Sequence, residues 1–243
     1  MNGSGFTDLH HHVLWGVDDG PKTPEQMAAM LELAVRNNVV QIAATSHAYP
    51  KYEPFDLAKY QERLAEANLY CFQQGWALRL ISGCEIHYCS SVPDMLIAGK
   101  LPTLGGTRMV LIEFDIGVTV EQIMQAASSL YRVGYQPIVA HVERYRCMVR
   151  SARQAMDIRE DCGLFLQMNC ETVLHPRGFW EKRFVRSMLE AQAIDLVASD
   201  AHDTSTRPVL MQNAYCLLAE KYGSAYAHRL THFDITGGNV MPL

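Results

Sequence analysis

Short apolar runs rich in β-branched residues recur along the chain, and each is followed by a stretch with the apolar spacing of an α-helix. Near-continuous apolarity, as in Val110-Leu111-Ile112, is typical of strands buried on both faces, which parallel sheets require. The runs predicted as strands are Phe6–Leu9, Val39–Ala44, Ala77–Gly83, Arg108–Glu113, Gln136–Ala140, Leu164–Met168 and Ile194–Ala198. About seven strand–helix units of this kind restrict the chain to a parallel α/β fold.

Helix start signals support this interpretation. Thr23, Pro24 and Gln26 combine an N-cap, a proline in the first turn and a capping-box partner. The predicted helices are Thr23–Asn37, Glu53–Gln74, Thr119–Val133, Cys147–Cys162, Gly178–Ala191 and Arg207–Tyr222. Repeated βα units without a linker favour one TIM-like barrel over two domains, although an open doubly wound sheet has the same local pattern. We therefore predict a single domain over residues 1–243.

Composition and charge exclude several classes of function. Hydrophobic residues make up 49% of the chain and charged residues 19%, which is typical of a soluble globule with a buried core. The net charge of -5, without a Lys/Arg cluster, argues against a nucleic-acid partner. No apolar run approaches the roughly 20 residues of a membrane helix, and Met1–Thr7 lacks the features of a signal peptide. We expect a cytoplasmic protein that does not insert into membranes.

Side chains of the kind that bind metals follow the predicted strands. They are Asp8, His10 and His12 after the first strand, His47 after the second, Glu85 after the third, Glu113 at the end of the fourth, His141 after the fifth, and Asp200 and His202 after the seventh. Because the carboxyl ends of parallel strands meet on one face, these residues should converge there. His10 and His12 share a face of an extended segment, and His11 points away.

The types of these residues indicate the chemistry. One such pair is more often structural, but two of them, His10 with His12 and Asp200 with His202, together with Glu and His at other strand ends favour a metal site. Nitrogen and carboxylate ligands without thiolate suit Mn, Fe or Zn. The seven cysteines form no C-x-x-C pair, which argues against a thiolate zinc site or a disulfide framework. We predict two to three divalent ions, with Mn foremost and Fe or Zn as alternatives, since one ion would be over-liganded and a two-metal site can activate water.

The segments around these residues have a recognisable order. They are Asp8-Leu9-His10-His11-His12, Val17-Asp18-Asp19-Gly20-Pro21, Thr45-Ser46-His47, Cys84-Glu85-Ile86, Leu111-Ile112-Glu113-Phe114, Ala140-His141-Val142-Glu143-Arg144-Tyr145 and Ala198-Ser199-Asp200-Ala201-His202. Together they resemble the PHP (polymerase and histidinol phosphatase) superfamily, and within it the bacterial tyrosine phosphatases of capsule and exopolysaccharide loci. The resemblance covers the chain from about Asp8 to Tyr222.

The resemblance implies a distorted TIM-like (β/α)7 barrel of the PHP type with three metal sites. The first ion would be held by His10, His12, Glu85 and Asp200, the second by Glu85, Glu113 and His141, and the third by Asp19, His47 and His202. The choice of Asp19 over the adjacent Asp18 stays open. The resemblance also implies that Arg144 and Arg207 bind the phosphate, and a guanidinium fork fits phosphate oxygens bidentately.

The predicted reaction is hydrolysis of phosphotyrosine on a protein by attack of a metal-bound hydroxide on phosphorus. The partner implied by the resemblance is the phosphotyrosine tail of a membrane-associated bacterial tyrosine kinase of capsule or exopolysaccharide synthesis, and the oligomeric state stays open. After His47 the chain reads Ala48-Tyr49-Pro50-Lys51-Tyr52, which is less basic than in many relatives, so the substrate is less fixed than the chemistry. The alternatives are a phosphatase of histidinol phosphate or a sugar phosphate, and a non-catalytic, metal-stabilised interaction module.

Four further features have competing interpretations. Cys147 and Arg153 have the C-x5-R spacing of cysteine-based tyrosine phosphatases, but residues 148–152 lack the glycines of a phosphate-cradling loop, so we interpret the match as accidental. Tyr49, Pro50 and Tyr52 either form an aromatic rim beside the metals or pack their loop. Trp180 and Phe184 are four residues apart, which is typical of a helix face against the core or a subunit contact. Glu143 either orients a ligand or forms a salt bridge.

Overall fold

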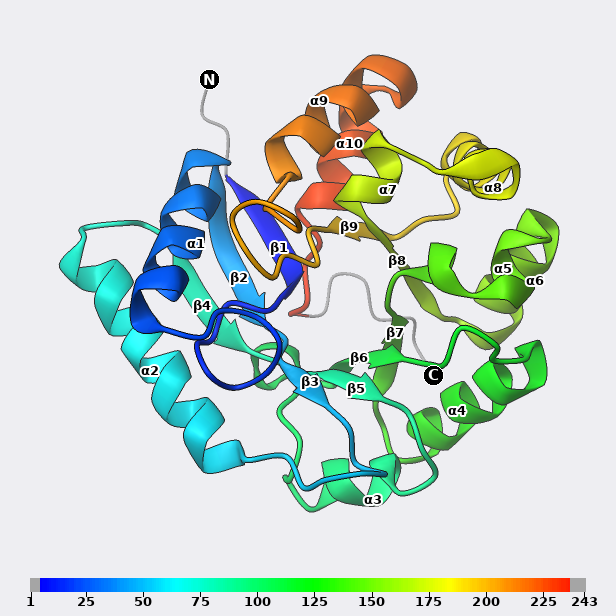
Figure 1. The fold of residues 1–243 in the computed structure, drawn as a ribbon. Helices are drawn as coiled ribbons and strands as arrows, with labels where there is room; N and C mark the ends of the chain where they lie inside the picture. The colour runs from blue at the N-terminus through cyan, green and yellow to red at the C-terminus, as the bar shows by residue number, and fades with distance from the viewer. Residues whose placement is uncertain (1–4, 237–243) are drawn as a thin grey trace.

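Parallel strands form the centre of the molecule. The computed structural model describes residues 5–236, and within them the strands form two hydrogen-bonded sheets that curl around the centre, with helices on the outer side (Figure 1). The first sheet has the order β1 (Phe6–His11), β2 (Val39–Ala44), β4 (Arg79–Ser82). The second has the order β3 (His47–Ala48), β5 (Glu85–His87), β6 (Met109–Glu113), β7 (Gln136–Val139), β8 (Phe165–Asn169), β9 (Leu196–Ala198). Every pairing is parallel, as predicted.

Two of the predicted strands are interrupted near their carboxyl ends. β2 continues into β3 after Thr45 and Ser46, and β4 continues into β5 after Gly83 and Cys84. The buried hydroxyl of Tyr60 bridges both interruptions, because it donates to the carbonyl of Ala44 at 2.8 Å and accepts from the amide of Gly83 at 2.9 Å. The short β3 and β5 pair with each other and place His47 opposite Glu85.

Backbone hydrogen bonds also join the first strand to the segment after the last one. The amide of Asp200 donates to the carbonyl of His10 at 2.8 Å, and the amide of His12 donates to the carbonyl of Ala201 at 2.9 Å. A register shift between Asp8 and His11 interrupts the pairing of β1 with β2 at the same level. Such bulges turn side chains toward functional sites, and here Leu9 lies in an inner apolar cluster while its neighbour His10 joins a polar one.

The helices cover the outer side of the sheets. They are α1 (Pro24–Arg36), α2 (Leu57–Gln73), α3 (Val92–Ile97), α4 (Val120–Arg132), α5 (Arg146–Val149), α6 (Ala152–Cys162), α7 (Cys170–Leu174), α8 (Gly178–Glu190), α9 (Met211–Tyr222) and α10 (Ser224–Thr231), with short 3-10 turns η1 (Leu104–Gly106) and η2 (Val142–Arg144). The helix predicted over Cys147–Cys162 is wrong as one element. Ser151 adopts an extended conformation and caps the start of α6, because its hydroxyl accepts from the amide of Gln154.

Two apolar clusters fill the interior. The larger one packs the outer face of the sheets against the helices. The smaller one lies inside the curl and includes Leu9, Leu111 and Ile138 from the strands and Phe233 and Ile235 from the end of the chain. Because this inner cluster fills the space between the strands, polar side chains collect at their carboxyl ends. Within residues 5–236, no helix combines the length and apolarity needed to cross a bilayer.

We predict that Tyr60→Phe lowers the free energy of unfolding by about 1–3 kcal/mol, because it leaves two buried backbone groups without a partner. Tyr215→Phe is the matched control, since the Tyr215 hydroxyl has no hydrogen-bond partner among the described residues. Urea unfolding of both variants checks this. Equal stability of the two variants would show that the Tyr60 hydroxyl does not hold the strand interruptions.

Candidate metal centre

The centre is built around the buried carboxylate of Glu85. Its Oε2 lies 3.2 Å from Nε2 of His10 and 3.2 Å from Nε2 of His12, and these two nitrogens lie 3.2 Å from each other. Oδ1 of Asp200 is 3.5 Å and 3.6 Å from the same two nitrogens. All four side chains are buried. They form a group whose ligand atoms lie within 4.8 Å of one another.

A second group shares His12 and extends toward the surface. Oδ1 of Asp19 lies 3.3 Å from Nε2 of His47 and 3.2 Å from Nε2 of His202. The adjacent Asp18 turns the other way, and its Oδ2 contacts Nδ1 of His12 at 2.8 Å. Asp18 also accepts from the amide of Gly20, a position where a Cβ would approach the carbonyl of His12 to 2.3 Å, so only glycine fits. Of the two aspartates, Asp19 faces the ligand group.

Glu113 and His141 complete the ring of candidate ligands. His141 Nε2 lies 2.6 Å from Oε1 of Glu85 and 3.6 Å from Oε2 of Glu113. Glu113 also groups with His47 and Glu85, which differs from the predicted set in which Glu113 and Glu85 join His141. Glu85 therefore contacts ligands of all three predicted ion sites, as a bridging carboxylate would.

Two of these residues occupy strained backbone conformations. His141 has a φ of 32° and Asp200 a φ of 54°, in the left-handed region that few non-glycine residues adopt. Each lies two residues beyond the end of a strand, His141 after β7 and Asp200 after β9, in the turn that places its side chain in the centre. Strain of this kind collects at functional sites, where the surrounding structure enforces it.

Polar side chains outside the candidate ligand set hold the candidate ligands in place. Oε1 of Gln167 accepts from the amide of His141 at 2.8 Å and lies 3.0 Å from Nδ1 of His10. Nδ2 of Asn169 donates to Oδ2 of Asp200 at 2.8 Å. Oε1 of buried Glu143 accepts from the amide of Asn169 at 2.9 Å, which gives Glu143 an orienting contact rather than a salt bridge. Such contacts fix the ring orientation and basicity of metal ligands.

The buried carboxylates favour positive charge on the histidine rings around them. Burial lowers the pKa of His12, but Asp18 and Glu85 outweigh burial and raise it to about 9. Burial would raise the pKa of Glu85, but His10 and the other histidines around it hold that pKa well below its usual range. His202 differs, because burial lowers its pKa and favours the neutral ring. Metal ions can replace the protons on these rings, since a ligand histidine must be neutral.

The geometry fits a metal centre. Ligand atoms about 2.0–2.2 Å from one ion lie roughly 3–3.5 Å from one another, which matches the spacing of His10, His12 and Glu85. Within residues 5–236, Nδ1 of His47 and Nε2 of His202 are buried and make no hydrogen bond of regular geometry, although Glu85 lies 3.1 Å from the former and Asp19 lies 3.2 Å from the latter. Oxygen and imidazole ligands without thiolate suit Mn, Fe or Zn.

Both predicted phosphate-binding arginines reach this centre. Nη2 of Arg144 donates to Oδ2 of Asp200 at 2.6 Å, and Nη2 of Arg207 donates to Oδ1 of Asp200 at 2.8 Å. The side chain of Arg144 is 42% exposed and that of Arg207 is 34% exposed, whereas Asp200 is buried. The two guanidinium groups therefore lie between the buried ligands and the solvent, where an anion would arrive.

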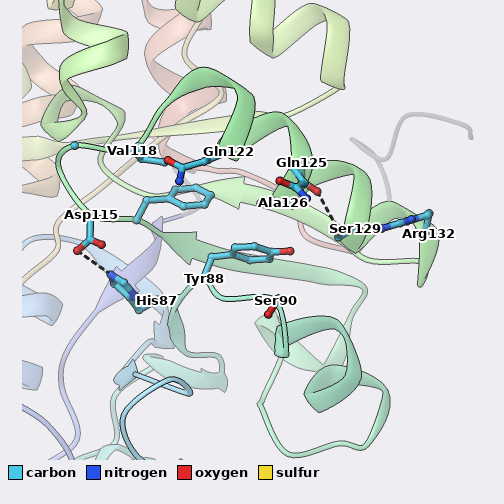
Figure 2. A pocket seen from close by; sticks show the side chains of 12 residues that line it. His87, Tyr88, Ser90, Asp115, Val118, Gln122, Gln125, Ala126, Ser129 and Arg132 are labelled. Carbon is cyan, nitrogen blue, oxygen red and sulfur yellow. Dashed lines mark hydrogen bonds and ion pairs between the residues drawn. The ribbon is translucent and has the colours of Figure 1, made fainter.

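A cavity of about 700 Å³ opens beside the centre, between α4 and the segments that follow β5 and β6 (Figure 2). His87 and Asp115 form an ion pair of 3.4 Å at one end of it, and Arg132 lies at the other end. The ring of Tyr49 stacks on His47 at 5.1 Å and lies 5.8 Å from His87, so this residue of the predicted rim does lie beside the metal ligands. Tyr52, in contrast, is 70% exposed.

Comparison with known proteins identifies the family. The sequence model described as "Capsular polysaccharide synthesis, CpsB/CapC" matches residues 6–235. The chain belongs to the CpsB/CapC family. It is 32% identical to the tyrosine-protein phosphatase CpsB of Streptococcus pneumoniae over 228 residues, which cover 92% of this chain and 93% of that protein. It is 29% identical to the tyrosine-protein phosphatase YwqE of Bacillus subtilis over 224 residues, with 92% and 88% covered.

A solved structure agrees with this assignment. Its description names YwqE from Bacillus subtilis and CpsB from Streptococcus pneumoniae as unique metal-dependent tyrosine phosphatases. It superposes on this chain with a TM-score of 0.83 and 28% identity, and covers 91% of this chain and 90% of its own. The resemblance found from sequence motifs to the capsule-locus phosphatases is thereby confirmed.

This member of the CpsB/CapC family brings together all nine predicted metal ligands and both arginines, whose individual roles stay predictions. Cys147 lies on α5, and burial raises the pKa of its thiol, which opposes the thiolate that a cysteine nucleophile needs. Sequence reasoning missed Gln167 and Asn169. The two are spaced by two residues at the end of a correctly predicted strand, as His10 and His12 are, and that position was the available signal.

We predict that Gln167→Ala weakens metal binding about 10–100-fold and leaves the fold intact, because His10 and His141 lose a common orienting partner. Gln136→Ala is the matched control, since Gln136 is also buried and hydrogen-bonded but begins β7 at the opposite end of the sheet. Competition with a chelator measures both affinities. Equal affinities in the two variants would remove Gln167 from the support of the centre.

Proposed function

We propose that this protein is a metal-dependent phosphatase that removes phosphate from phosphotyrosine on a protein. The observation that supports this most directly is that His10, His12, Glu85 and Asp200 converge in one buried group. Arg144 and Arg207 both donate hydrogen bonds to Asp200. Its CpsB/CapC relatives are named tyrosine-protein phosphatases. We propose that the three ion sites are those implied by the family resemblance, with Mn as the first ion to test.

We infer that the two curled sheets form one distorted seven-stranded barrel and that residues 1–243 make a single domain. The hydrogen bonds between His10–His12 and Asp200–Ala201 support closure between the first and last strands. The pairing of β5 with β6 supports continuity between the two sheets across the strand interruptions. A closed barrel would explain why ligands from distant strands share one buried centre.

The arginines bind the phosphate. Asp200 fixes both guanidinium groups, and Asn169 fixes Asp200, so two cations are preorganised at the solvent side of the centre. Because these cations are already in place, they need not reorganise when negative charge develops on a phosphoryl group held there. Divalent ions held by the candidate ligands would lower the pKa of a bound water molecule to about 7 and so make a hydroxide nucleophile available at neutral pH. The phenol of tyrosine has a pKa near 10, so its phenolate leaves with less acid assistance than an alkoxide.

We further propose that the substrate is the phosphotyrosine tail of a membrane-associated bacterial tyrosine kinase of capsule or exopolysaccharide synthesis, and that the reaction takes place in the cytoplasm. The family description, capsular polysaccharide synthesis, supports this choice. The partial exposure of Arg144 and Arg207 also supports it, because a phosphate on a protein segment can reach them.

The substrate class can be tested directly. We predict that phosphotyrosine peptides exceed histidinol phosphate and sugar phosphates in kcat/KM by at least about tenfold, a transition-state difference near 1.4 kcal/mol. Chelation should abolish all turnover, and Mn should restore it. Full activity after chelation would overturn the metal mechanism, whereas a preference for histidinol phosphate would replace only the substrate.

The role of the arginines can be separated from that of the metals. We predict that Arg144→Ala and Arg207→Ala keep their metals but lose about two orders of magnitude in kcat/KM, because the transition state loses a preorganised charge. Cys147→Ser is the control that should retain activity. Loss of metal from either arginine variant would make that arginine structural, and an inactive, folded Cys147→Ser protein would restore the thiolate mechanism.

A further inference from the structure

A groove leads away from the metal centre on the side of Arg144. A small cavity lined by Asp200, Arg207, Arg144 and Asn169 adjoins one of about 310 Å³ that shares Arg144 and Asn169. The latter shares Arg144 and Arg177 with a third cavity of about 320 Å³. Because neighbouring cavities share side chains, the three adjoin one another and together make up this groove. We call it the α5–α8 groove, and its main residues are Arg144, Arg146, Arg150, Arg177, Phe179 and Trp180.

Two exposed aromatic rings form the far end of this groove. Phe179 is 68% exposed and Trp180 is 54% exposed, and their rings meet edge to face at 5.4 Å. The core side of α8 is formed by other residues, such as Phe184, which is buried. Packing against the core, one of the two interpretations of Trp180 and Phe184, therefore holds for Phe184 and is wrong for Trp180, while a subunit contact through Trp180 stays a prediction. Exposed large aromatic side chains of this kind are typical of binding surfaces.

The groove is basic although the chain is acidic overall. Arg146 and Arg150 are exposed, and within residues 5–236 their side chains form no ion pair or hydrogen bond. Arg177 pairs with Glu171 at 2.5 Å, and Arg144 pairs with Asp200. The acidic residues of the groove are Asp200 and Glu143, which are buried, and the partly buried Glu171 and Glu181. Two unpaired cations thus face the solvent in a protein of net charge -5, which favours an anionic ligand.

Hydrogen bonds anchor the backbone between Arg144 and Arg146 beside the centre. Tyr145 is fully buried, and its hydroxyl accepts from the amide of Phe114 at 3.2 Å. The amide of Arg146 donates to the carbonyl of Ile116 at 3.2 Å. Arg144 and Arg146 therefore flank an anchored residue, one beside the metal centre and the other in the third cavity.

We propose that the α5–α8 groove binds the residues that flank the phosphotyrosine of the peptide substrate, and that it selects acidic flanking segments with an aromatic or other apolar side chain. This inference rests on the proposed function. An extended peptide advances about 3.3–3.6 Å per residue, so a few residues beyond the phosphotyrosine enter the groove. Arg146 and Arg150 attract their carboxylates, and Phe179 and Trp180 pack against the apolar side chain.

The test compares kinetics on three substrates: a phosphotyrosine peptide with acidic flanks, the same peptide with neutral flanks, and p-nitrophenyl phosphate. For wild-type protein we expect kcat/KM to be higher for the acidic peptide and the difference to shrink with added salt. Arg150→Glu and Trp180→Ala should each raise KM for the acidic peptide about tenfold, with kcat and the turnover of p-nitrophenyl phosphate unchanged. Arg132→Glu is the matched control, because it makes the same charge reversal in the separate cavity of Figure 2.

The outcomes separate this inference from the proposed function. If wild-type protein hydrolyses both peptides equally well, the groove does not select acidic flanks and only the inference fails. If it hydrolyses neither peptide, the proposed function fails too. Equal effects of Arg132→Glu and Arg150→Glu would show a general charge effect and overturn the inference. The inference would also be overturned if Arg150→Glu and Trp180→Ala matched the wild type in peptide kinetics but lost binding to anionic lipid vesicles. The groove would then be a membrane contact.

Discussion

A carboxylate buried among histidines dominates the structure of this protein. Glu85 is 1% exposed, and its two oxygens lie within 3.2 Å of His10, His12, His47 and His141. A buried charge is costly unless cations and hydrogen bonds surround it. The chain meets this requirement with four rings from three strand ends, since His10 and His12 both lie at the end of β1. The centre and its supporting contacts therefore depend on one another.

The same requirement explains the irregular parts of the fold. The interruptions in the second and third strands bring His47 beside Glu85, and Tyr60 ties the interrupted segments together. His141 and Asp200 adopt left-handed backbone conformations that cost of order 1–3 kcal/mol each. The apolar cluster inside the curl offsets this strain by holding the strands at fixed positions. Rigid support of this kind preorganises Asp200 and the two arginines beside it.

Local sequence signals predicted the regular elements well. All seven predicted strands are present, with ends within two residues of those observed, because parallel strands buried on both faces are nearly continuous apolar runs. The missed elements, such as β3, β5 and α3, are short and carry too few residues for a periodic pattern. The break before α6 was also missed. The helical pattern of the sequence continues through Ser151, and this pattern gives no sign of the capping contact with which Ser151 begins α6.

The sequence by itself determined the types of residue at the site and the order in which they follow the strands. That was sufficient for the family and for a metal centre, because ligand chemistry is a property of side chains. Only the tertiary structure decided that Asp19 faces the centre while Asp18 supports His12, and that Gln167 links His10 to His141. It also decided that Phe184 is buried while Trp180 lines a basic groove. Such choices depend on which elements pack together across many residues, and no local pattern in the chain contains that information.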